Sequence, residues 1–181
     1  ATCVSVCLRA RKCRLNRVVE PSPAGALPVV TFGDSLALHF NGDDLEVQHY
    51  AAGHTDGDSV VYFTAENVVH MGDLFFKDRF PFVDIGSGGS VPGYIAAVQA
   101  VLERVDGSTV IVPGHGSLAS RADLESYLNM LQITSAAVSE KLAAGESVEA
   151  IAEAGLGDAW TTWGGGFINE ATWISFIANS Q

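Results

Sequence analysis

The sequence predicts an α/β protein in which a mixed sheet is flanked by helices. Short β-branched apolar runs recur through the first two thirds of the chain, and two longer segments carry apolar residues at helical spacing. The order of strands, helix, strand and helices is typical of helices packed against a sheet. With 181 residues, 48% of them hydrophobic, the chain fits one domain with a substantial core.

Six runs rich in Val, Ile, Tyr, Phe and Thr predict the strands. They cover residues 29–32, 35–40, 45–50, 59–64, 67–70 and 110–112. Asn41-Gly42 supplies a turn between the second and third runs, because an Asn-Gly pair favours a tight hairpin. A second hairpin is expected across residues 65–66.

Four helices are expected, one before the last predicted strand and three after it. Ser90 is positioned to cap the first, and Ser120 caps a long second helix, with Asp123 at the reciprocal position of a capping box. Gly145 is expected to end that long helix. Residues 147–154 and 169–178 predict two shorter helices.

The first 27 residues differ in composition from the rest of the chain. Half of the ten basic residues lie within the first 17 positions, together with all three cysteines, Cys3, Cys7 and Cys13. The cysteine spacing lacks the short-spaced pairs of a zinc site. We expect residues 1–27 to be a disordered basic leader and Pro-rich linker, and 28–181 to be the folded domain. Non-native sequence at a fragment boundary and a transit-like segment stay open as alternatives.

The charge distribution excludes some partners. The net charge is −11, and the body beyond the leader is acidic, so a nucleic-acid partner is not expected. The sequence has no run of 18 apolar residues, so no membrane-spanning helix is expected. We expect a soluble protein of the cytoplasm or periplasm, and the sequence does not decide the compartment.

Three of the predicted strands end in a glycine beside a side chain that binds metals well. The pairs are Gly53-His54, Gly72-Asp73 and Gly114-His115. Each pair alone is more often a turn than a ligand. On loops at one edge of a sheet, however, two imidazoles and a carboxylate can converge on a hard or borderline cation.

The order and spacing of these motifs resemble the metallo-β-lactamase-fold metallohydrolases, over about residues 32–178. The match is best with glyoxalase II-like and lactonase-like members, which have Asp rather than Cys at the middle position. Residues 53–59 (Gly-His-Thr-Asp-Gly-Asp-Ser) resemble the third metal motif of the family, 71–73 the fourth and 113–116 the fifth. The resemblance implies that His54 binds a first metal, His115 a second, and that Asp73 bridges both and serves catalysis.

The resemblance also implies the chemistry. Two zinc ions, or other divalent metals, would activate water for attack on an ester, thioester, lactone or amide-type bond of a small-molecule substrate. The family fold is an αββα sandwich.

One family motif is absent from this sequence. His-x-His-x-Asp-His, which gives two ligands to each metal, does not occur among the five histidines. We therefore expect the C-terminal part of such a sandwich, with weak metal binding and little hydrolysis by this chain alone. The alternative is a truncated, inactive half-domain that serves only as a folded or dimerising module. A second copy in a homodimer, or the missing N-terminal half, would cover the exposed sheet face.

Three further residues are candidates near the site. Asp58 is expected either to orient His54 through its ring nitrogen or to cap the loop by a hydrogen bond. By the resemblance Phe80 and Phe82 border the substrate groove, although core packing is the favoured explanation for both. The remaining histidines are expected to be structural: His39, His49 and His70.

Overall fold

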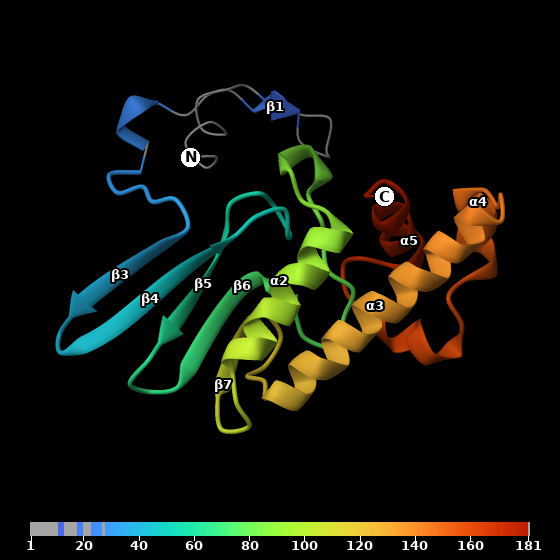
Figure 1. The fold of residues 1–181 in the computed structure, drawn as a ribbon. Coiled ribbons are helices and arrows are strands. Elements are labelled where there is room, and N and C mark those ends of the chain that lie inside the picture. Colours follow the sequence, from blue (N-terminus) through green and yellow to red (C-terminus); the bar gives the residue numbers. More distant parts are fainter. Residues whose placement is uncertain (1–10, 13–17, 20–22, 27, 181) are drawn as a thin grey trace.

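The structure is a computed structural model that describes residues 11–12, 18–19, 23–26 and 28–180. Its centre is a five-stranded sheet in the order β3-β4-β5-β6-β7 (Figure 1). The first four strands are antiparallel neighbours, and β7 lies parallel to β6. The expected α/β class, with a mixed sheet and flanking helices, is confirmed. The expectation for residues 1–27 falls mostly outside the described residues.

The strand bounds correct the sequence prediction in three places, one of which is the strand predicted at 110–112, which continues to His115. The main sheet consists of β3 Ser35–Phe40, β4 Asp43–Tyr50, β5 Asp58–Phe63, β6 Val68–Phe76 and β7 Val110–His115. The predicted strand at 29–32 is wrong: this stretch is irregular, and Val29 and Val30 are exposed, so their β propensity has no neighbour to pack against. The strand predicted to end at residue 70 continues to Phe76 and therefore includes Asp73.

Short elements precede this sheet. β1 Arg11–Lys12 pairs antiparallel with β2 Val18–Val19, and a 3₁₀ turn, η1, covers Ala24–Ala26.

The predicted helices are present, and their caps form as expected. They are α2 Val91–Arg104, α3 Arg121–Ala143, α4 Val148–Ala154 and α5 Glu170–Ala178, with 3₁₀ segments η2 Ile85–Ser87 and η3 Asp158–Gly165. Ser90 accepts a hydrogen bond from the Gly93 backbone, and Ser120 and Asp123 form the reciprocal capping box. None of the described helices has both the length and the apolar character that a membrane crossing needs.

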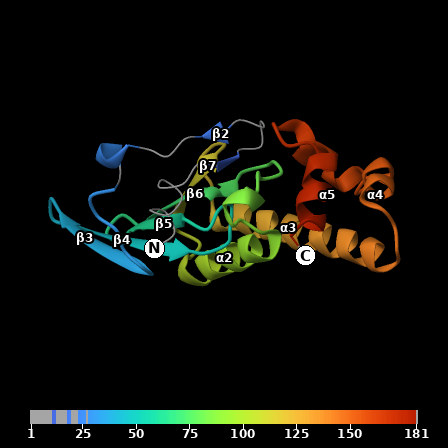
Figure 2. The same cartoon turned by 90° about the horizontal axis from the view of Figure 1, so that it is seen from above.

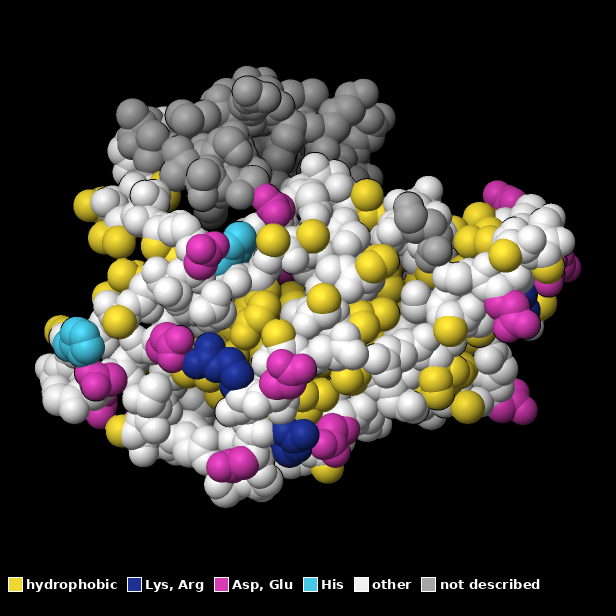
Figure 3. All heavy atoms as spheres, in the orientation of Figure 1, with side chains coloured by type: hydrophobic (Ala, Val, Ile, Leu, Met, Phe, Trp, Pro, Cys, Tyr) yellow, Lys and Arg dark blue, Asp and Glu magenta, His cyan; other side chains and the backbone are white. Residues whose placement is uncertain are grey.

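The core lies between one face of the sheet and the helices α2 and α3, which run across that face in Figure 2. The sheet contributes the buried side chains Val60, Tyr62, Val69, Met71 and Ile111, and α5 adds Trp173. The molecule carries many acidic and few basic side chains on the face shown in Figure 3, in keeping with its net charge of −11.

The other face of the sheet is apolar and partly exposed. By the strand register, each of the five strands places aliphatic or aromatic side chains on this face, and none of these side chains is fully buried. They are Leu36, Leu38, Leu45, Val47, Val61, Phe63, Val68, Val110 and Val112. Leu38 and Val110 keep 45% and 40% of their surface exposed. This face has the character expected of a surface that another layer covers.

Candidate metal centre

The three predicted ligand side chains meet at one edge of the sheet. His54 lies in the loop after β4, Asp73 lies within β6, and His115 is the last residue of β7. Nε2 of His54 is 3.5 Å from Oδ2 of Asp73, and Nε2 of His115 is 3.3 Å from Oδ1 of the same carboxylate. Each imidazole therefore faces a different oxygen of Asp73.

A backbone carbonyl, not a carboxylate, orients His54. Its Nδ1 is 2.8 Å from the carbonyl oxygen of Phe82, so Nδ1 must carry the proton and Nε2 is left to face Asp73. Asp58 instead accepts hydrogen bonds from the backbone N–H of Thr55 at 2.9 Å and from its hydroxyl at 3.0 Å. Of the two roles expected for Asp58, the structure shows the loop cap. Burial raises the pKa of Asp58 above its ordinary value, although these hydrogen bonds oppose the shift.

The start of α2 holds the His54 loop at very short range. The backbone N–H of Ser90 bonds the carbonyl oxygens of Ala52 and Gly53, both at 3.0 Å. A Cβ atom on Gly89 would lie 2.2 Å from the carbonyl oxygen of His54, so only glycine permits this approach. The Gly-rich segment 86–90 thus fixes the ligand loop.

A break in the β6–β7 ladder presents the Asp73 carboxylate. Gly72 has φ of +53°, and the register shifts on both sides of this residue. Opposite it, a Cβ atom on Gly114 would lie 2.6 Å from Oδ1 of Asp73. Glycine at position 114 therefore gives the carboxylate its space beside β7.

His115 is held by an aromatic ring that the sequence analysis did not single out. Phe76 stacks on the His115 ring with centroids 4.4 Å apart and an interplanar angle of 18°. The backbone N–H of Lys77 donates to the His115 carbonyl oxygen at 2.9 Å. The last residue of β6 and the residue after it thus fix the ring and the backbone of His115.

Two buried tyrosines lie beneath Asp73. The Tyr94 hydroxyl donates to the Asp73 carbonyl oxygen at 2.6 Å, and the Tyr127 hydroxyl donates to Tyr94 at 2.9 Å. Burial raises the pKa of both phenols above the ordinary value, so both remain neutral donors. Helical spacing marks Tyr94 only as a core position, which is why its contact with Asp73 could not be read from the sequence.

The two candidate phenylalanines, Phe80 and Phe82, have different surroundings. Phe80 is buried and stacks on Trp173 with centroids 5.8 Å apart, which is the packing role favoured for it. Phe82 meets the His54 ring edge-on at 5.5 Å and lies 6.0 Å from the ring of Phe167. Phe167 is 78% exposed and was not recognised in the sequence. Phe82 and Phe167 form an aromatic surface beside His54.

The other three histidines bond elsewhere. Nε2 of His49 lies 2.7 Å from the Asp56 carbonyl oxygen, and Nδ1 of His70 accepts the Gly72 N–H at 3.1 Å. His39 pairs with Asp44 across the β3–β4 hairpin. These contacts agree with structural roles.

His54, Asp73 and His115 have the side-chain types and the arrangement of a shared metal site, but they are too few to give each ion a full set of ligands. Imidazole nitrogen and carboxylate oxygen are good zinc ligands, and one carboxylate stands between two imidazoles. Within the described part of the chain, no group of three or more His, Cys, Asp or Glu side chains is arranged to hold one ion. Each ion would receive one imidazole and one carboxylate oxygen, whereas catalytic zinc usually has about three protein ligands.

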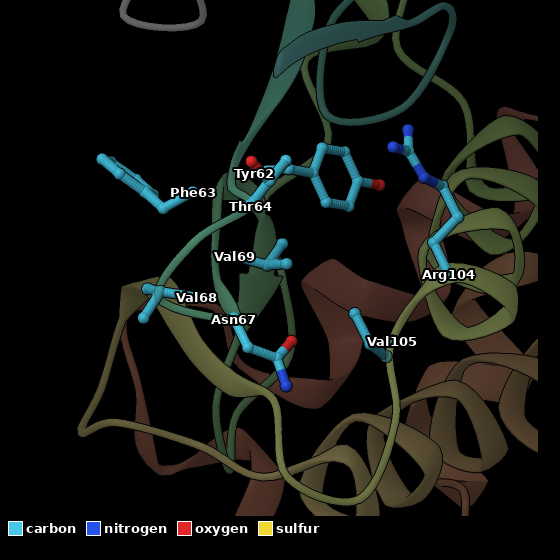
Figure 4. A pocket seen from close by; sticks show the side chains of 8 residues that line it. All are labelled: Tyr62, Phe63, Thr64, Asn67, Val68, Val69, Arg104 and Val105. Carbon is cyan, nitrogen blue, oxygen red and sulfur yellow. The ribbon is translucent and has the colours of Figure 1, made fainter. Parts of the chain in front are cut away.

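A separate hollow lies at the start of β6, and Asp73 is not among the residues that line it (Figure 4). It has a volume of about 200 Å³ and is lined by Tyr62, Phe63, Thr64, Asn67, Val68, Val69, Arg104 and Val105. The Arg104 guanidinium lies 3.8 Å from the centre of the Tyr62 ring and pairs with Glu46 at 2.8 Å. The positive charge of Arg104 is thus already balanced by Glu46.

Known proteins share this architecture. The model of the metallo-beta-lactamase superfamily matches residues 8–115. A metallo-beta-lactamase from Pontibacter korlensis is 25% identical, over 59% of this chain and 50% of its own, with a TM-score of 0.51. No curated protein gives a significant match.

Two further solved structures show the same fold at low identity. The stereoselective inverting sec-alkylsulfatase Pisa1 from Pseudomonas sp. is 14% identical, over 88% of this chain and 27% of its own, with a TM-score of 0.60. A double mutant of this sulfatase is 15% identical over 85% of this chain and 26% of its own, with a TM-score of 0.64. The chain thus spans half or less of the length of these proteins. The sequence match and the fold together show that the chain belongs to the metallo-beta-lactamase superfamily.

Proposed function

We propose that this chain supplies three ligands, His54, Asp73 and His115, to a two-metal hydrolase centre in which Asp73 bridges the ions. The observation that carries the proposal is the placement of the two Nε2 atoms, 3.5 Å and 3.3 Å from separate oxygens of one carboxylate. Family membership supports it, and zinc is the expected ion because the ligands are imidazole and carboxylate.

The protein groups have distinct tasks in this centre. Phe82 fixes the tautomer that leaves Nε2 of His54 free, and Phe76 fixes the ring plane of His115. Asp73 offers one oxygen to each side and places negative charge between the two ion positions. When bound, the ions would supply Lewis acidity, which acidifies water and polarises the electrophilic group of a substrate.

The surface beside His54 favours a small substrate with an apolar part. Phe82 is half-buried and Phe167 is largely exposed, so an apolar group could cover both rings while its ester, thioester, lactone or amide-type bond lies over Asp73. Asp at position 73, rather than Cys, is a feature of the glyoxalase II-like and lactonase-like relatives. It favours esters, thioesters and lactones over β-lactams.

A second function is favoured by the ligand count and by the partly exposed apolar sheet face. With two ligands for each ion and such a face, the chain in isolation would be a folded module that catalyses nothing. Further ligands would then come from another chain that covers this face. On this account the chain alone binds zinc weakly and hydrolyses little.

Zinc titration by calorimetry tests the proposal. We expect weak binding by the 181-residue chain that Asp73→Ala abolishes, because Asp73 touches both ion positions. His39→Ala is the matched control, since this exposed imidazole also pairs with an aspartate but lies at the β3–β4 hairpin. Zinc binding that does not depend on Asp73 would contradict the metal proposal. Tight binding with Asp73-dependent turnover of a lactone, thioester or β-lactam would contradict the weak-binding account.

A further inference from the structure

Part of β6 has no ladder partner in β7. The parallel register pairs Gly72 with Pro113 and then Phe76 with His115, with no pair between them. Asp73 lies in this gap, so its backbone carbonyl needs another donor, because an unpaired carbonyl in a protein interior is unfavourable.

Tyr94 on α2 supplies that donor from within the core. Its side chain is fully buried, and its hydroxyl lies 2.6 Å from the Asp73 carbonyl oxygen. Tyr127 on α3, also fully buried, donates to the Tyr94 oxygen at 2.9 Å. Each hydroxyl has one proton, and the Tyr127 bond leaves the Tyr94 proton directed at Asp73.

The same pair reaches β6 at a second point. The Tyr127 ring packs on the Phe75 ring with centroids 4.9 Å apart, and the next residue, Phe76, stacks on His115. The two helices therefore hold β6 at the residue that carries the carboxylate and beside the residue that supports the second imidazole.

We propose that Tyr94 and Tyr127 are positioning residues that set the Asp73 carboxylate between His54 and His115. Their effect on metal binding rests on the proposed function, whereas their hold on the backbone of residues 72–76 does not. The chain contains a matched comparison: Tyr50 and Tyr62 also join their hydroxyls at 2.9 Å, but neither bonds a candidate ligand.

The test combines hydrogen exchange of the metal-free chain with zinc titration, for Tyr94→Phe, Tyr127→Phe and the control Tyr62→Phe. Tyr94→Phe should speed amide exchange in residues 72–76 on the order of tenfold, since the Asp73 carbonyl loses its donor. Zinc affinity should fall by about tenfold, as for loss of an outer-shell partner. Tyr127→Phe should give smaller changes of the same kind, and it serves as the second variant should Tyr94→Phe not fold.

The hydrogen-exchange data test the positioning role of Tyr94 and Tyr127 independently of the zinc titration. Unchanged exchange in residues 72–76 of the folded variants, or an equal change there in Tyr62→Phe, would overturn it. Absence of zinc binding by the unsubstituted chain would refute the proposed function, while faster local exchange in Tyr94→Phe would still support the backbone role.

Discussion

Nε2 of His115 lies 3.3 Å from Oδ1 of Asp73, although 42 positions separate the two residues in the sequence. The parallel pairing of β6 and β7 produces this contact, because it brings the ends of both strands to the same edge of the sheet. His54 reaches the other oxygen from the loop after β4. The structure leads to four predictions about individual residues and one about the centre itself.

His54 and His49 should have opposite tautomers. A carbonyl oxygen only accepts, so Nδ1 of His54 must carry a proton toward Phe82, whereas Nε2 of His49 must carry one toward Asp56. Long-range ¹H–¹⁵N correlation spectra of the metal-free chain, at a pH where the imidazoles are neutral, would distinguish them. A protonated Nε2 in His54 would show that Phe82 does not orient this ring.

Gly114→Ala should destabilise the fold and displace the carboxylate. The new Cβ would lie 2.5 Å from the Gly72 carbonyl oxygen and 2.6 Å from Oδ1 of Asp73, and such overpacking costs about 1–3 kcal/mol. Gly107→Ala is the control, because nothing lies within 4 Å of a Cβ there. Thermal melts should show a clear fall in midpoint for the first variant only. Equal midpoints would mean that β6 and β7 are farther apart than in this structure.

Phe80→Ala and Phe167→Ala should affect stability differently, because Phe80 packs in the core and Phe167 lies on the surface. Phe80 is buried against Trp173, so its truncation should reduce the free energy of unfolding by about 3–5 kcal/mol. Phe167 is 78% exposed, and its truncation should leave stability nearly unchanged. Urea denaturation measures both. A large loss of stability for Phe167→Ala would indicate that this ring is part of the core.

Asp106 should make stability depend on pH below 4. Hydrogen bonds from the Ser108 hydroxyl and backbone, with others from Asn67 and Thr109, lower the pKa of Asp106 from 3.8 to about 2. The unfolded chain binds this proton more tightly, so the contribution is present above pH 3.8 and is lost as the pH falls toward 2.

Ser108→Ala checks this contribution, because it removes the largest cause of the shift. The difference in melting midpoint between Ser108→Ala and the unsubstituted chain should shrink between pH 4 and 2. A difference that is constant over this interval would show that the Asp106 pKa is not lowered by Ser108.

The sequence was sufficient to predict the mixed sheet, the helix caps and the three residues that meet at its edge. Strand ends, capping boxes and Gly-His pairs are local signals, so neighbouring residues alone disclose them. The long β6 was missed because Gly72 looks like a strand end, yet its φ of +53° permits a bulge that the strand passes through. The prediction of a strand at 29–32 was wrong because its valines have β propensity but no neighbouring strand to pair with.

The contacts that orient the site are made across the fold, and no local pattern marks them. The Phe82 carbonyl, the Phe76 ring and the Tyr94 hydroxyl act on residues that are 28, 39 and 21 positions away. A backbone carbonyl has no sequence signature, and an aromatic residue in a strand or helix usually indicates only the core. Phe167 was overlooked because it follows a Gly-rich turn and belongs to no apolar pattern.

The most direct test of the central claim is the ¹⁵N chemical shift of each histidine during zinc addition. If Asp73 bridges two ions held by His54 and His115, the Nε2 signals of these two residues should move, and Asp73→Ala should abolish both changes. Signals of His39, His49 and His70 should stay in place. Shifts confined to those three histidines, or shifts of His54 and His115 that persist in Asp73→Ala, would contradict a metal centre built on Asp73.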